Sequence, residues 1–135
     1  MKKIAVALGI LSVFSVVSAY AQSSEAPEAS VFVPISKYFE QGDTDCIAAW
    51  FADNLEMEVL GKTNNCSKNQ AKQILRSFFM NYTPKNFVIV YTSGSYPMQY
   101  AVGNLDGGGS SFRVTFLVKT NEVGNYIEQL KIEKK

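Results

Sequence analysis

Residues 101–114 read AVGNLDGGGSSFRV and place three consecutive glycines between two segments of alternating apolar residues. Asp106-Gly107 between such segments is a strong signal for a β-hairpin. A phosphate-binding P-loop would need a lysine directly after the glycines, and a dinucleotide-binding loop would have to open a helix. The residues that follow alternate as a strand does. The stretch therefore predicts a hairpin that joins two antiparallel strands.

The C-terminal half of the chain continues this strand pattern. Residues 86–92, NFVIVYT, are apolar on both faces, so both faces should be covered. Residues 126–134, YIEQLKIEK, close the chain. In 111–119, alternate residues on one face are all apolar. They are Phe112, Val114, Phe116 and Val118.

Helical patterns precede these strands. Apolar residues at helical spacing predict helices over 32–42 and 43–54, and a capping box predicts a third over 67–79. Between them, the alternation in 55–61 predicts a half-exposed strand, followed by a turn at 62–66. Helices followed by an antiparallel meander indicate an α+β domain with segregated layers.

The N-terminus has the pattern of a signal peptide. Lys2 and Lys3 precede a short apolar run, and residues 19–21, AYA, fit a signal peptidase site. We expect 1–21 to be removed and the chain to be exported to the periplasm or envelope of a bacterium. A retained N-terminal anchor is the alternative. After cleavage we expect no transmembrane segment.

The remainder of the chain divides into a tether and one domain. Residues 22–30 are small, polar and acidic, which predicts a flexible tether, and 31–135 have the length of a single domain. The net charge of +1 falls to −1 without Lys2 and Lys3. This balance excludes the basic surplus that nucleic-acid binding requires.

Two cysteines, Cys46 and Cys66, lie in the predicted domain. In an oxidising compartment such a pair permits one disulfide, which we expect here. Two buried free thiols are the alternative. Their spacing is not that of a redox Cys-x-x-Cys motif.

The chain has no histidine. This removes the common general base and zinc ligand, and no cofactor or metal site is predicted. The remaining candidate for chemistry is Glu128. If Leu130 and Ile132 point inward, then Tyr126 and Glu128 should do so too, which would place a carboxylate in an apolar pocket. Alternatively Glu128 lies at the rim, pairs with a lysine, or is redirected by a bulge.

Several aromatic residues are candidates to line a ligand pocket with Glu128. They are Trp50, Tyr91, Tyr100 and Tyr126. Aromatic residues at these spacings are also common in an ordinary core, which is the alternative.

The order of these segments resembles the nuclear-transport-factor-2-like fold, and more closely a family of small exported bacterial proteins of unknown function. The segments that carry the resemblance are PISKYFEQGD, AWFADNLEMEVLG, SKNQAKQILRSFF, YTPKNFVIVYTSG, YAVGNL, FRVTFLVKT and IEQLKIEK. The resemblance implies a cystatin-like cone, with three N-terminal helices packed on a curved antiparallel sheet of about four to six strands and a pocket at its open end.

The resemblance also implies which classes of function to expect. Some superfamily members perform isomerase or dehydratase chemistry with an Asp or a His–Asp pair, and Tyr91 stands where some exported relatives have histidine. Such domains often dimerise through the outer sheet face, which suits the apolar Val88, Val90 and Leu117. We expect a non-catalytic domain that binds a small apolar or amphipathic ligand or a partner. The alternatives are an isomerase-like or dehydratase-like enzyme with Glu128 as base, and a structural envelope module.

Overall fold

The computed structural model describes residues 31–135, within which Pro34–Lys135 forms one compact unit. The predicted signal peptide (1–21) and tether (22–30) lie outside the described residues. Within the described part of the chain, no helix is long and apolar enough to span a membrane.

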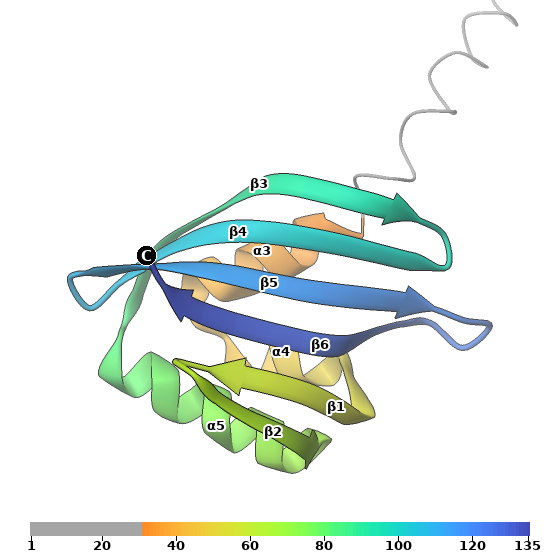
Figure 1. The fold of residues 1–135 in the computed structure, drawn as a ribbon, viewed down its shortest axis with the longest axis horizontal. Helices are drawn as coiled ribbons and strands as arrows, with labels where there is room; N and C mark the ends of the chain where they lie inside the picture. Colours follow the sequence, from red (N-terminus) through yellow and green to blue (C-terminus); the bar gives the residue numbers. More distant parts are fainter. Residues whose placement is uncertain (1–30) are drawn as a thin grey trace, which may run out of the picture. The chain divides into compact units, whose positions relative to one another are not determined.

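Three helices and six strands make up the described part (Figure 1). The helices are α3 (Phe32–Gln41), α4 (Thr44–Ala49) and α5 (Lys68–Asn81). The strands are β1 (Phe51–Val59), β2 (Lys62–Ser67), β3 (Pro84–Ser95), β4 (Met98–Gly107), β5 (Ser110–Thr120) and β6 (Asn125–Lys134). Helix α3 crosses behind β4 and β5, and α5 runs alongside β1 and β2.

The strands form one sheet in the order β2-β1-β6-β5-β4-β3. This confirms the predicted α+β class. Two details of the prediction are wrong. Strand β1 runs parallel to β6, so the sheet is mixed rather than antiparallel, because the meander β3–β6 brings the last strand back beside the first in the same direction. Helix α5 also follows two strands, β1 and β2, whereas one strand was predicted before it.

The core lies between α3, α5 and the face of the sheet that we call the inner face. Its centre is Phe39 of α3, which is fully buried. The ring of Phe39 stacks on Phe87 of β3 and Phe116 of β5, with centroid distances of 5.0 and 5.9 Å, and meets Phe79 of α5 edge-on at 6.2 Å. One ring thereby links both helices to both halves of the meander.

Gly103 of β4 makes room for this stack. A Cβ atom at position 103 would lie 2.3 Å from Cζ of Phe87. The glycine therefore lets the Phe87 ring lie directly over the β4 backbone, where it reaches Phe39.

The predicted glycine hairpin is confirmed. Gly107 pairs with Ser110, so the loop consists of Gly108 and Gly109, whose φ angles of 58° and 79° fit a type I′ turn. Asp106 lies one position earlier, inside β4, where its carboxylate accepts a hydrogen bond of 2.8 Å from Ser111 Oγ.

Two local predictions are wrong around β1. The helix predicted over 43–54 ends at Ala49, and Phe51 begins β1 by pairing with Ile127 of β6. The turn predicted at 62–66 is strand β2. At Phe51, pairing with the distant strand β6 overrides local spacing, which periodicity within one segment does not reveal. At 62–66, the polar residues of a hairpin partner of β1 were interpreted as a turn.

We predict that Gly103→Ala destabilises the protein by about 1–3 kcal/mol, because the methyl group would displace the Phe87 ring. Urea unfolding followed by tryptophan fluorescence measures this. Gly124→Ala is the matched control, since no atom lies within 4 Å of a Cβ built there. Equal midpoints for the two variants would contradict the close packing of Phe87 on Gly103.

Candidate functional site

The aromatic candidates do not gather in the core. Tyr91 pairs with Val102 and Tyr100 pairs with Leu117, on the face opposite the core, which we call the outer face. Tyr91 is 58% exposed and Tyr100 is 38% exposed. Tyr126 lies opposite exposed Lys119.

Trp50 caps the C-terminus of α4 and is half-buried. Its carbonyl accepts a hydrogen bond from Ile127 N. The backbone of this residue thus ties the end of α4 to β6.

Glu128 lies in a bulge of β6. Val118 of β5 pairs with Ile127 and Leu117 pairs with Gln129, so Glu128 is an additional residue without an opposite partner in β5. Ile127 is fully buried, whereas the Glu128 side chain is 38% exposed. Its carboxylate lies 4.0 Å from Lys119 Nζ. The inward direction inferred from Leu130 and Ile132 is therefore wrong at this position, because the bulge shifts the alternation.

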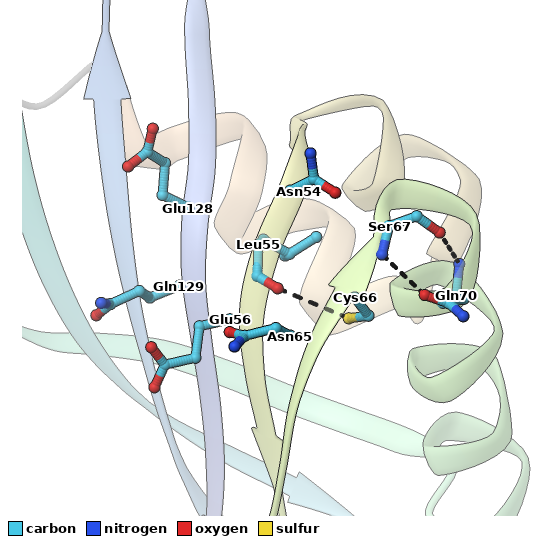
Figure 2. Close-up of a pocket in the computed structure, with 9 residues that line it drawn as sticks. All are labelled: Asn54, Leu55, Glu56, Asn65, Cys66, Ser67, Gln70, Glu128 and Gln129. Atoms are coloured by element: carbon cyan, nitrogen blue, oxygen red, sulfur yellow. Dashed lines mark hydrogen bonds between the residues drawn. The ribbon is translucent and has the colours of Figure 1, made fainter.

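Glu128 borders a surface groove of about 480 Å³, which we call the polar groove (Figure 2). The residues that line it are Asn54, Leu55, Glu56, Asn65, Cys66, Ser67, Gln70, Glu128 and Gln129. Figure 2 shows the carboxylates of Glu128 and Glu56 on the side of β1 away from Cys66 and Gln70.

On the side of the polar groove formed by Ser67 and Gln70, the polar groups already bond to one another. Ser67 N donates to Gln70 Oε1 at 3.0 Å, and Gln70 N donates to Ser67 Oγ at 3.3 Å, which forms the predicted capping box of α5. Among the described residues, no group of three or more Cys, Asp or Glu side chains is arranged to hold a metal ion.

Cys46 and Cys66 are both free thiols, so the expected bridge is not formed. Cys46 lies in α4, whereas Cys66 lies in β2, directly before the N-cap Ser67 of α5, and is buried beside Leu55, whose carbonyl is 3.8 Å from its sulfur. Burial raises the pKa of the Cys66 thiol. The hydrogen bond with Asp43, then burial and the charges of Asp43 and Asp45, raise the pKa of the Cys46 thiol.

A second groove lies on the inner side of the β1–β2 hairpin, against α5, and has a volume of about 450 Å³. We call it the amphipathic groove. Its apolar lining residues are Met57, Val59, Leu60, Ile74, Phe78 and Tyr82. Its polar lining residues are Lys62, Asn64, Gln73, Ser77 and Asn81. Lys62 is thus the one charged residue of this lining.

Leu60 has an unusual backbone at the rim of this groove. Val59 pairs with Lys62, so Leu60 and Gly61 form the two-residue turn, with φ angles of 52° and 88°. Type I′ turns favour Asn-Gly, and a leucine in the left-handed region costs about 1–3 kcal/mol. Leu60 nevertheless is 43% exposed, so burial in the core does not offset this cost. An apolar side chain held there points to a role in the groove.

Sequence reasoning missed the amphipathic groove because 62–66 was interpreted as a turn. One signal was present. In KTNNC, Lys62, Asn64 and Cys66 occupy alternate positions opposite the alternating apolar residues of 55–59, as expected of a second hairpin strand.

Comparison with known proteins gives a family and a fold. The model of a family described as a domain of unknown function (DUF4783) matches residues 32–133. A DUF4783 family protein from Bacteroides uniformis is similar in structure, with a TM-score of 0.71 and 19% identity over 82% of this chain and 98% of that one. A DUF4783 family protein from Bacteroides ovatus is also similar, with a TM-score of 0.72 and 19% identity over 76% of this chain and 94% of that one.

A more distant similarity is found to a domain of unknown function with a cystatin-like fold from Nostoc punctiforme. The TM-score is 0.59, with 11% identity over 74% of this chain and 70% of that one. No curated protein matches the chain. At these identities the solved structures support the fold alone.

We predict that Glu128→Gln changes the free energy of unfolding by less than about 0.5 kcal/mol, because an exposed ion pair at 4.0 Å contributes little. Chemical denaturation at pH 7 tests this. Ile127→Ala is the contrasting variant and should lower the free energy of unfolding by about 2–5 kcal/mol, since Ile127 is fully buried. A comparable loss of stability in Glu128→Gln would indicate a structural role that the ion pair does not explain.

We predict two free thiols per chain when the protein is denatured without reductant and titrated with a chromogenic disulfide. In the folded protein the reaction should be slow at pH 7. The rate should rise with pH and should continue to rise beyond the ordinary thiol pKa of 9.0 instead of levelling off there, because both pKa values are raised and the thiolate is the reactive form. A titration of zero thiols would show that Cys46 and Cys66 are bridged.

Proposed function

Because the chain belongs to the DUF4783 family of bacterial domains of unknown function, we propose its role from its own surface: a non-catalytic domain that binds a small amphipathic ligand in the amphipathic groove. The single observation that carries the proposal is Leu60, an exposed apolar residue kept at positive φ on the rim of that groove.

The lining of the groove supports this class of ligand. Met57 and Phe78 are buried at its floor and Ile74 is half-buried, so an apolar chain would find apolar contacts there. Amide and hydroxyl side chains follow the polar part of the lining. A groove of this size, mostly apolar with a few polar groups, is typical of small-molecule sites.

Lys62 favours a ligand with an acidic head group. It is exposed, lies in β2 and pairs with Val59 next to the turn. An ammonium group at the edge of an apolar surface can bind a carboxylate while its methylene groups cover apolar atoms. A medium-chain fatty acid is the simplest ligand with this chemistry.

We do not propose proton-transfer catalysis. The residues that line the amphipathic groove include no carboxylate. Glu128 borders the separate polar groove and is partly exposed beside Lys119, which is a poor setting for a general base that needs a water-excluded substrate.

Export to the periplasm or cell envelope is part of the proposal. Its support is the N-terminal sequence, where Lys2 and Lys3, an apolar run and the AYA site occur in the order of a signal peptide.

Leu60→Asn separates binding from folding. We expect the variant to be as stable as the wild type or more stable, because asparagine tolerates positive φ, and to bind decanoate at least about fivefold more weakly, because an apolar contact is lost. Isothermal titration calorimetry with decanoate and thermal unfolding measure the two effects.

Leu117→Asn is the matched control, since Leu117 is a half-buried leucine on the outer face, away from the groove, and its loss should not change decanoate affinity. Lys62→Gln should weaken decanoate binding more than decanol binding, while Lys119→Gln should change neither. Unchanged decanoate affinity in both Leu60→Asn and Lys62→Gln, or no binding by the wild type, would overturn the proposal.

A further inference from the structure

The two edges of the sheet differ in a way that points to an interaction. Strand β2 is a short edge of six residues that are mostly polar and include Lys62. Strand β3 is an edge of twelve residues, and in the described part of the chain it has a strand neighbour only on the β4 side. A long edge presents unpaired backbone N–H and C=O groups, which proteins ordinarily shield with charges, with bulges or by keeping the strand short. The register of β3 against β4 shifts between Pro84 and Asn86 and between Ile89 and Tyr91, and it is regular from Tyr91 to Ser95.

The β3 edge carries one charge, Lys85, at its beginning. From Asn86 to Leu105 the sequence contains no Asp, Glu, Lys or Arg, and we call this segment the uncharged arm. Within it, residues 90–98 are all exposed, and Tyr91 and Tyr96 are 58% and 74% exposed. Tyrosine and methionine are enriched, and charges depleted, at the centres of protein interfaces.

The rest of the outer face has the opposite character. Lys131 lies 3.6 Å from Glu58 and 3.7 Å from Glu133, and Lys119 lies near Glu128. Stacking two complete outer faces would bury these ion pairs, whose desolvation is costly. Such stacking is the mode expected from the family resemblance, whereas pairing through the edge leaves these charges in water.

We propose that β3 pairs edge to edge with β3 of a second copy of this chain. In a two-fold symmetric pair the same residues of both copies face one another, so a charge near the axis would meet its own copy. The uncharged arm avoids that repulsion, whereas a different partner would ordinarily be selected by complementary charges, which the arm lacks. Antiparallel β3 strands would satisfy each other's backbone groups, and the exposed Val88 and Val90 would be partly covered.

The test uses sets of like charges on the arm. The purified wild-type protein should have twice the chain mass by light scattering. Val88→Lys/Tyr91→Lys and Val88→Glu/Tyr91→Glu, at two exposed positions of the outer face, should each dissociate at least about tenfold more readily, because like charges oppose one another across the axis. Mixing the two variants should restore the dimer, since opposite charges then meet. Circular dichroism confirms that both variants are folded.

Two controls make the result specific. Thr63→Lys/Asn65→Lys places the same charges on the β2 edge and should remain dimeric. Leu117→Lys places a charge on the outer face away from the β3 edge and should also remain dimeric. A monomeric wild type, dissociation by Leu117→Lys but not by the arm variants, or failure of the mixed variants to pair would each overturn the proposal. Decanoate binding is independent of these outcomes, because the amphipathic groove lies at the other end of the sheet.

Discussion

The stack of Phe39 on Phe87 and Phe116 is the contact on which the rest of this domain depends. It joins α3 to both halves of the meander, and it exists because Gly103 leaves space for the Phe87 ring. Filling the centre of the inner face with rings gains burial energy, about 1.5–3 kcal/mol for each large apolar side chain. The two proposed recognition sites, the groove beside α5 and the β3 edge of the sheet, both lie outside this centre.

Strand β1 determines where those outer features lie. Its parallel pairing with β6 brings the end of the chain beside its first strand, and its hairpin with β2 projects over α5. The amphipathic groove is the space between that hairpin and the helix, and Leu60 stands at its turn. The bulge in β6, opposite Leu117 and Val118 of β5, directs Glu128 toward solvent instead of the core.

Features with a complete local cause could be predicted. The capping box of Ser67 and Gln70 begins α5 because both hydrogen bonds lie within one turn of chain. The glycine run made the β4–β5 turn predictable because only glycine adopts positive φ at two successive positions at little cost. The end of α4 was missed because Phe51 takes its strand conformation from Ile127, a partner distant in sequence. Strand β2 was missed because its polar residues resemble a turn, although its partner β1 directly precedes it in the chain.

Composition and local spacing were enough to predict the α+β class, the glycine hairpin and the capped helix, and to exclude chemistry that needs histidine, since each depends on composition or on neighbours within a few residues. Only the tertiary structure decided which way Glu128 points, that Tyr91 and Tyr100 lie on the outer face, and that Cys46 and Cys66 remain apart. The physical reason is register. A single additional residue in one strand reverses the faces of those that follow it, and register is set by pairing between strands rather than within one.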